Sequence, residues 1–311
     1  MGCGSPDATT SPPTPSTPAS RPPAPPAAEG PPRLSVDPVC LIYASGTTAL
    51  PKAVVSTHAQ VLFAARAIQQ VLRYRAEDVV YSPLPLSFDY GLYQLFLGGL
   101  SEALVRLGRP AETGPGLLTR LRDSQATVLP AVPSVAGALA RLLQRSNAGL
   151  PRLRLLTNTG AAMPKETLDA LRGACPRLQV QLMYGLTECK RATVMPVDGD
   201  QVRPGSSGLP LPGTDVFVVD DAGRRLPHGA VGEITVRGPH VMAGYWRRPA
   251  LTAERYVPDA VGMRHGYLKD SPTGLERALR DLRSASLNYS NDRLHLVDGK
   301  LALLDPEVRF V

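Results

Sequence analysis

The sequence predicts an α/β fold, in which a largely parallel sheet with flanking helices is followed by a small antiparallel β-barrel-like subdomain. Two patterns along the chain support it. From residue 37 to about 195, short β-branched runs alternate with helical stretches, the order that crossover helices over a parallel sheet produce. From about residue 203, closely spaced Gly and Pro separate short alternating runs, which is typical of antiparallel strands.

Strands of the parallel sheet are expected where short apolar runs are bounded by turn residues, at 39–43, 79–81, 127–129, 153–157 and 180–184. Helices are expected between them, at 57–73, 90–97, 117–122, 134–144 and 164–172. Thr57 and Ser134 are predicted N-caps, because a hydroxyl there accepts from a free backbone N–H. Pro164 is predicted in a first helical turn, where its missing N–H costs no hydrogen bond.

The second region holds two alternating runs, 216–219 and 232–237, which indicate a small antiparallel barrel or sheet. Beyond residue 270 the chain shows a helical run at 274–283 and short strands around 294–304, without a recognisable motif. We therefore divide the chain into a disordered Pro-rich tail (1–36), an α/β nucleotide-binding subdomain (37–202), a small β subdomain (203–262) and a C-terminal tail (263–311).

The N-terminal segment is dominated by small residues and proline. Residues 1–33 contain 11 of the 32 prolines and almost no large apolar side chain, so they bury too little surface to offset the entropy of ordering. The segment lacks the basic start and apolar core of a signal peptide. We expect it to be disordered, with recognition as a polyproline II ligand as the alternative.

Composition limits the classes of partner. No apolar run is long enough to span a membrane, and the four cysteines lack metal-site spacing, which together favour a soluble protein in the reducing cytoplasm. The net charge of +7 comes mostly from scattered Arg residues, and no basic stripe interleaved with aromatics indicates nucleic-acid binding. Such a diffuse positive field suits anionic small molecules, for example nucleotides or CoA.

The most informative segment is the turn at 43–52, which follows the apolar run 39–43. It combines small residues, the hydroxyls of Ser45, Thr47 and Thr48, and the ammonium of Lys52. Backbone N–H groups in a small-residue turn point outward together, and the hydroxyls and the cation add to them, so the turn suits a polyphosphate. Taken by itself, a solvated turn between strands explains these residues as well.

Further motifs follow in order: Thr-Asn-Thr-Gly-Ala-Ala-Met-Pro at 157–164, Tyr-Gly-Leu-Thr-Glu at 184–188, Gly-Glu-Ile-Thr-Val-Arg-Gly at 232–238 and Gly-Tyr-Trp at 244–246. With the turn at 43–52, they resemble the adenylate-forming superfamily of acyl-CoA synthetases, luciferases and peptide-synthetase adenylation domains. The resemblance runs from about residue 37 to 258. The residue sequences at 85–92 and 188–191 are most similar to those of AMP-forming acyl-CoA ligases, including the exosortase-associated type.

The resemblance implies an acid–thiol ligase that uses ATP, Mg²⁺ and CoA. A carboxylic acid substrate would react with ATP to give an acyl adenylate and pyrophosphate, and CoA or a carrier protein would then accept the acyl group. Thr187, Glu188 and Lys52 would be catalytic, with Glu188 as the magnesium ligand, and Phe88, Asp89 and Tyr90 would border the acyl pocket. The nucleotide would lie against Ser45, Gly46, Thr47, Thr48, Lys52, Gly160, Ala161, Ala162, Tyr184, Gly185, Thr187 and Asp270.

The chain departs from the family pattern at several points. Ala49 and Ala53 occupy glycine positions of the phosphate loop, where alanine is strained if the backbone requires positive φ. Compared with the family, we expect a chain truncated at both ends, with Asp270 standing in for the ribose aspartate and no equivalent of the catalytic lysine. These departures predict a weak or inactive enzyme. A non-catalytic nucleotide- or acyl-binding pseudoenzyme and a degraded fragment are the alternatives.

Overall fold

The computed structural model describes Met1, residues 34–44, 51–146, 149–227 and 230–258, and the backbone of three further strands at 266–269, 294–297 and 300–303. The chain divides after Arg33 into two units, and the fold described below is that of the second, Leu34–Val311. The expected helix at 274–283 lies outside the described residues.

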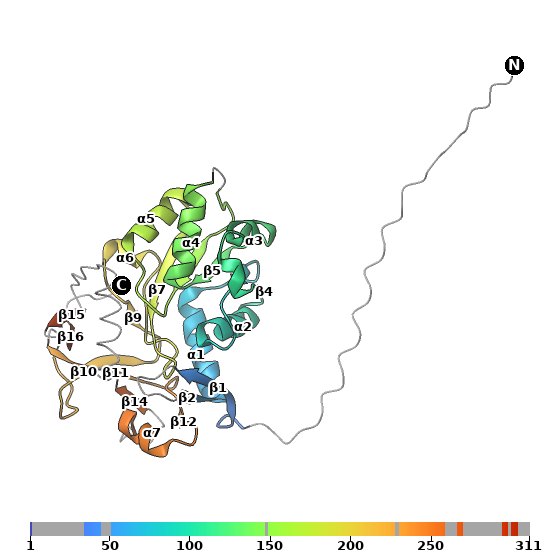
Figure 1. Cartoon of the computed structure of the whole chain (residues 1–311). Coiled ribbons are helices and arrows are strands. Elements are labelled where there is room, and N and C mark those ends of the chain that lie inside the picture. Colours follow the sequence, from blue (N-terminus) through green and yellow to red (C-terminus); the bar gives the residue numbers. More distant parts are fainter. Residues whose placement is uncertain are drawn as a thin grey trace. The chain divides into compact units, whose positions relative to one another are not determined.

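A seven-stranded sheet forms the centre of the α/β part, in the order β4-β3-β5-β6-β7-β8-β9 (Figure 1). Its first five strands are parallel and the last two antiparallel. The predicted α/β class with a largely parallel sheet is confirmed, although β4 was not predicted. The strands are β3 (Val79–Ser82), β4 (Leu104–Leu107), β5 (Val128–Ala131), β6 (Leu155–Asn158), β7 (Gln179–Tyr184), β8 (Thr193–Val194) and β9 (Leu209–Pro210).

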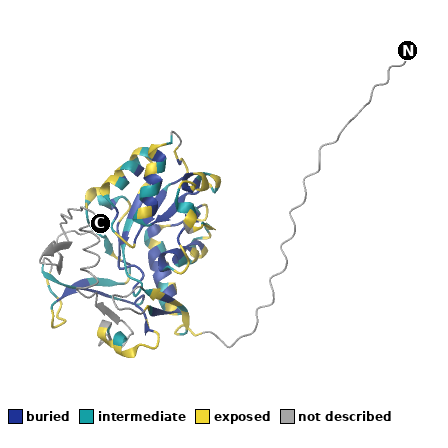
Figure 2. Cartoon of the chain, in the orientation of Figure 1, coloured by how far each residue is buried: buried dark blue, intermediate teal, exposed yellow. Residues whose placement is uncertain are grey.

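Helices cover both faces of this sheet, and Figure 2 shows its strands as the buried layer. Neighbouring residues of one strand point to opposite faces. Leu129 and Leu156 accordingly pack with α3, α4 and α5, whereas Val128 and Leu155 pack with α1 and α2. The helices are α1 (His58–Leu72), α2 (Asp89–Ser101), η1 (Pro110–Thr113), α3 (Leu117–Asp123), α4 (Pro133–Gln144), α5 (Lys165–Ala174), α6 (Gly199–Val202) and α7 (Pro249–Arg255). Within the described residues, none of these helices is long and apolar enough to cross a membrane.

Helix starts agree only in part with the sequence signals. Thr57 caps α1 as predicted: its hydroxyl accepts from the Gln60 amide, and the Gln60 side chain accepts from the Thr57 amide. The prediction of Ser134 as an N-cap is wrong, because α4 already begins at Pro133, whose missing N–H suits that first position. Pro164 is the N-cap of α5, one residue before its predicted place in the first turn.

The strand expected at 39–43 does not belong to the parallel sheet. Here β1 (Pro38–Ala44) pairs antiparallel with β2 (Lys52–Thr57), and β2 pairs with β12 (Gly244–Tyr245). Parallel neighbours need a long crossover connection, whereas antiparallel strands need only a short one. Only seven residues, 45–51, separate the end of β1 from the start of β2, which suits an antiparallel pair. The predicted turn at 43–52 is therefore a hairpin connection, not a crossover between parallel strands.

A separate antiparallel sheet follows, as the alternating runs predicted, in the order β13-β14-β11-β16-β15, with β10 also paired to β11. Its longest strand, β11, carries the Gly-Glu-Ile-Thr-Val-Arg-Gly motif. The strands are β10 (Asp215–Val219), β11 (Val231–Gly238), β13 (Tyr256–Pro258), β14 (Gly266–Lys269), β15 (Leu294–Val297) and β16 (Lys300–Leu303).

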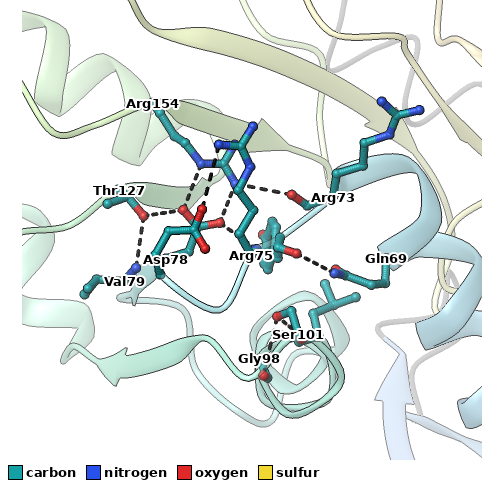
Figure 3. Close-up of polar contacts among 12 residues, drawn as sticks. Gln69, Arg73, Arg75, Asp78, Val79, Gly98, Ser101, Thr127 and Arg154 are labelled. Carbon is teal, nitrogen blue, oxygen red and sulfur yellow. Dashed lines mark hydrogen bonds and ion pairs between the residues drawn. The ribbon is translucent and has the colours of Figure 1, made fainter.

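A buried carboxylate joins the starts of three parallel strands (Figure 3). Asp78, just before β3, accepts hydrogen bonds from Nε and Nη2 of Arg154, from the Thr127 hydroxyl at 2.7 Å and from the Arg75 amide at 2.9 Å. Thr127 precedes β5 and Arg154 precedes β6. Burial by itself would raise the pKa of Asp78, but these donors together hold the pKa below its usual value.

We expect Asp78→Asn to lower the free energy of unfolding at pH 7 by about 3 kcal/mol, because it leaves Arg154 without its ionic partner. Since the folded-state pKa of Asp78 is depressed, its stabilisation is present above a pH of about 4 and is lost as pH falls through the folded pKa. Denaturant unfolding at pH 7 and pH 3 measures both effects. Glu77→Gln, at the exposed neighbouring carboxylate, is the control, and an equal loss in both variants would contradict this role of Asp78.

Candidate functional site

Several of the predicted site residues lie where β6 and β7 end. These neighbouring parallel strands both carry a motif in the loop after their last residue, and ligands bind at the carboxyl ends of strands in open α/β sheets. After β6 come the small residues Gly160, Ala161 and Ala162. After β7 come Gly185, Leu186, Thr187 and Glu188. The start of α2, at Asp89, lies against the same end.

The loop after β6 offers an open backbone surface suited to a flat ring. Gly160 adopts φ of +90°, which favours glycine, and both Gly160 and Ala161 are exposed. A Cβ at Gly160 would lie 3.7 Å from Cζ of Phe88, so the predicted adenine surface borders the predicted acyl pocket. Tyr184 is half-buried at the end of β7, consistent with one covered and one accessible ring face.

The loop after β7 is a tight turn that only glycine permits at its start. A Cβ at Gly185 would lie 2.2 Å from the Lys190 carbonyl oxygen and 2.8 Å from Cα of Arg191. This close backbone contact folds residues 185–190 into one compact turn. Thr187 and Glu188 lie half-buried on it, whereas Lys190 and Arg191 are buried.

Tyr245 joins the two predicted phosphate-binding elements. Its hydroxyl donates a 2.7 Å hydrogen bond to Oε1 of Glu188, and Nζ of Lys52 lies 5.5 Å from the centre of its ring. The pairing of Tyr245 with Val54 in the β1-β2-β12 sheet places the ring beside Lys52, because residues two apart on a strand share a face. The proposed magnesium carboxylate and the proposed phosphate lysine thus lie on either side of one tyrosine.

The centre of the predicted phosphate loop, Ser45, Gly46, Thr47, Thr48 and Ala49, lies outside the described residues, as does Asp270. The ends of the loop are described, because Ala44 and Lys52 face each other in the hairpin. Ala53 is buried in the extended strand β2 and its backbone has no positive φ. The strain considered for an alanine at position 53 is therefore absent.

The part of the site predicted to border the acyl group is charged. Asp89 and Arg191 are buried, with side chains 4% and 3% exposed, and Nη1 of Arg191 donates to Oδ2 of Asp89 at 3.2 Å. The Arg191 guanidinium also lies 4.7 Å from the centre of the Tyr90 ring. The hydroxyls of Tyr90 and Thr157 share a 2.7 Å hydrogen bond. The predicted pocket residues Asp89 and Tyr90 are thus brought together with Arg191, which sequence reasoning did not place there.

A second buried cation lies beside this pair. Lys190 is fully buried, and its Nζ lies 3.4 Å from the carbonyl oxygen of His240. Burial lowers the pKa of Lys190, and burial together with the charge of Lys190 lowers the pKa of His240 to about 3. His240 is therefore a neutral core residue. The sequence signal for Lys190 and Arg191 was their position just after the Thr-Glu motif, separated from it by Cys189 alone.

The donor set at Glu188 fits magnesium better than a transition metal. Among the described residues, no group of three or more His, Cys, Asp and Glu side chains is arranged to hold a metal ion. Mg²⁺ does not require such a cage, since it usually binds one or two carboxylates together with water and substrate phosphates. Glu188 is half-buried and hydrogen-bonded to Tyr245, whose ring also contacts Lys52, so its carboxylate suits an ion held jointly with a polyphosphate.

Comparison with known proteins identifies the family. Residues 5–246 match the family model of the AMP-binding enzyme. The chain belongs to this AMP-binding enzyme family. Membership confirms the resemblance to adenylate-forming ligases, whereas the exosortase-associated branch stays a prediction.

Individual members of the AMP-binding enzyme family share most of this chain. The 4-coumarate–CoA ligase 1 of Arabidopsis thaliana is 31% identical over 250 residues, which cover 77% of this chain and 43% of that ligase. The chain thus spans less than half the length of this relative. O-succinylbenzoate CoA synthetase from Bacillus subtilis, solved with AMP, is 26% identical with a TM-score of 0.65, covering 76% of this chain and 47% of that one.

The solved structures of VinN show higher identity. One has 42% identity and a TM-score of 0.72, covering 89% of this chain and 62% of VinN. A complex of VinN with L-aspartate has 43% identity and a TM-score of 0.68, covering 78% and 62%. A complex with 3-methylaspartate has 41% identity and a TM-score of 0.63, covering 78% and 57%.

We expect His240→Leu to reduce the acid sensitivity of the fold. Since the folded-state pKa of His240 is about 3 and a free histidine titrates near 6.5, the unfolded chain binds an extra proton between these values. Unfolding free energy should therefore rise with pH over this interval by about 1.4 kcal/mol per unit in the parent, and the variant should lack this contribution. Denaturant unfolding at pH 4.5, 5.5 and 6.5 gives the slopes. His58→Gln, at a partly exposed histidine, is the control, and an unchanged slope in His240→Leu contradicts the account.

Proposed function

We propose that this chain activates the carboxylate of a small acidic amino acid, of the aspartate class, by joining it to the α-phosphate of ATP. A carboxylate oxygen forms a bond to the α-phosphorus as the bond to the β-phosphate oxygen breaks, which yields an acyl adenylate and pyrophosphate. The observation that carries the proposal is the buried ion pair of Asp89 and Arg191 at the predicted acyl end of the site, with Lys190, also buried, next to Arg191 in the sequence.

Buried charges require partners. An apolar acyl chain placed beside Asp89 and Arg191 would leave their remaining donors and acceptors without hydrogen bonds, at a cost of several kcal/mol. Nε of Arg191 is already buried without a hydrogen-bond partner among the described residues. A ligand with its own ammonium and second carboxylate would satisfy these groups, because Asp89 would accept from the ammonium and Arg191 and Lys190 would bind the carboxylate.

The comparisons support an amino acid of this class. VinN has been solved in complexes with L-aspartate and 3-methylaspartate, and in these structures its sequence is 43% and 41% identical to this chain. The 4-coumarate–CoA ligase is 31% identical. A fatty acid, which the resemblance to acyl-CoA ligases allows, carries one carboxylate and no ammonium. Its single charge is used at the reacting end, so it offers nothing to Asp89 and Arg191.

The nucleotide end of the proposed site is formed by the loops after β6 and β7 and by β2. Gly160, Ala161 and Ala162 would lie against the adenine, with Tyr184 on one ring face, while Lys52 and the hydroxyls of Ser45, Thr47 and Thr48 would bind the outer phosphates. Thr187 would hydrogen-bond to the α-phosphate and Glu188 would hold Mg²⁺. When bound, this ion neutralises phosphate charge as pyrophosphate leaves.

We further propose a thiol acceptor, either CoA or a carrier protein, and a slow overall reaction. Ala49 places a methyl group where the family's phosphate loop has glycine, which crowds the phosphates. Ala53 adds no backbone strain in β2, so the expected weakness rests on Ala49 in this loop.

Carboxylate-dependent exchange of pyrophosphate into ATP tests this function with the full chain. Exchange should be slow but measurable with L-aspartate and 3-methylaspartate, and at least tenfold weaker with hexanoate and 4-coumarate at equal concentration. Exchange with the apolar acids at or above the aspartate rate would overturn the substrate class. No exchange with any acid, together with ATP binding in calorimetry, would favour the non-catalytic nucleotide-binding alternative, and absence of both would contradict the whole proposal.

We expect the double variant Asp89→Ala, Arg191→Met to raise KM for L-aspartate at least tenfold, which corresponds to about 1.4 kcal/mol of binding. Removing both partners avoids leaving one buried charge uncompensated, so the fold should be retained. ATP affinity, measured by calorimetry, should change less than twofold. The matched control removes an exposed pair by Asp169→Ala, Lys165→Met, and an unaltered aspartate KM in the buried-pair variant would contradict the assigned role.

A further inference from the structure

Tyr245 contacts both Lys52 and Glu188, two residues of the proposed nucleotide site that are far apart in the sequence. It belongs to β12, the third strand of the sheet that starts with the phosphate-loop hairpin. Tyr245 is 6% exposed and belongs to a buried apolar cluster with Val54, Cys189 and Met242. Apolar packing explains where the ring lies, but it does not require a hydroxyl.

The Tyr245 hydroxyl makes one specific polar contact with the site. It lies 2.7 Å from Oε1 of Glu188, close to the usual distance for a hydroxyl that donates to a carboxylate. The backbone of Glu188 is fixed as well, since its carbonyl accepts from the Met242 amide at 2.7 Å. Main chain and side chain of Glu188 are thus both held by residues 242–245, which lie more than fifty positions later.

The ring of Tyr245 also engages the phosphate lysine. Nζ of Lys52 lies 5.5 Å from the ring centre, within the range of a cation–π interaction. Such a contact is weak at a partly exposed site, so it keeps the ammonium near the phosphate loop without preventing it from binding a phosphate. One side chain therefore holds the anionic ligand and the cationic ligand of the same proposed polyphosphate.

We propose that Tyr245 is a positioning residue for the magnesium–nucleotide complex: its hydroxyl fixes Oε1 of Glu188 so that Oε2 is presented to the ion, and its ring holds Lys52 beside the phosphates. This inference rests on the proposed function. A carboxylate with one oxygen held by a donor loses less rotational freedom when it binds a metal ion, and such supporting donors commonly change metal affinity by 10–100-fold.

The chain allows the hydroxyl and the ring to be separated. Tyr245→Phe removes the donor to Glu188 and keeps the packing surface and the cation–π partner of Lys52. Tyr245→Leu removes both. Tyr81→Phe is the matched control, because the Tyr81 hydroxyl also donates to a carboxylate, Oε2 of Glu112 at 2.8 Å, and Glu112 has no role in the proposed site.

Calorimetric titration with ATP, once with EDTA and once with Mg²⁺ in excess, separates the two roles. For Tyr245→Phe we expect unchanged ATP affinity in EDTA, within twofold, and at least a fivefold loss of the affinity gained on adding Mg²⁺. Tyr245→Leu should in addition weaken ATP binding in EDTA about threefold, because Lys52 is no longer held. Tyr81→Phe should match the parent chain in both titrations.

The titrations distinguish failure of the proposed Tyr245 role from failure of the proposed function. If Tyr245→Phe keeps the full magnesium gain, or loses affinity equally with and without Mg²⁺, the hydroxyl is only part of the packing and the inference is overturned while the proposed function stands. If the parent chain binds ATP under neither condition, the proposed function fails and this inference fails with it.

Discussion

The carboxylate of Asp78 is the interaction on which the arrangement of the sheet depends most. It is buried before β3 and accepts from groups that directly precede β5 and β6, so it fixes how far the starts of three strands are offset from one another (Figure 3). Parallel strands have no tight hairpin to set their register. Because the strands are short, an offset fixed at their starts also determines where their carboxyl ends lie, and those ends carry the site.

Several elements could be predicted because their signal is local. The apolar runs of β3, β5, β6 and β7 and the Thr57 cap each depend on residues close in sequence. Pairing is not local, so the run at 39–43 was recognised as a strand but assigned to the wrong sheet. The edge strand β4 was missed because Arg106 interrupts its apolar run and both Leu104 and Leu107 are exposed.

The same distinction applies to the site. Motifs placed Gly160, Tyr184 and Glu188 near one another, because each follows or ends one of two adjacent strands. The contacts that give the site its chemical character join distant residues: Asp89 and Arg191 are 102 positions apart, and Glu188 and Tyr245 are 57 apart. The residue types alone did not predict these contacts, since an Arg that follows a motif is usually a solvated surface residue.

The tight turn that begins at Gly185 relates the two ends of the proposed site. Glu188 faces the phosphate end and Arg191 the acyl end, yet they are three residues apart on a turn whose closure leaves no room for a Cβ at Gly185. Lys190, which lies between them, is fully buried and anchors this part of the turn in the core. The residues proposed to bind a charged acid and the carboxylate proposed for a metal–nucleotide complex are thus connected by one short, closed turn. Such preorganisation favours reaction between two bound substrates, since their reacting atoms must meet in a narrow range of geometry.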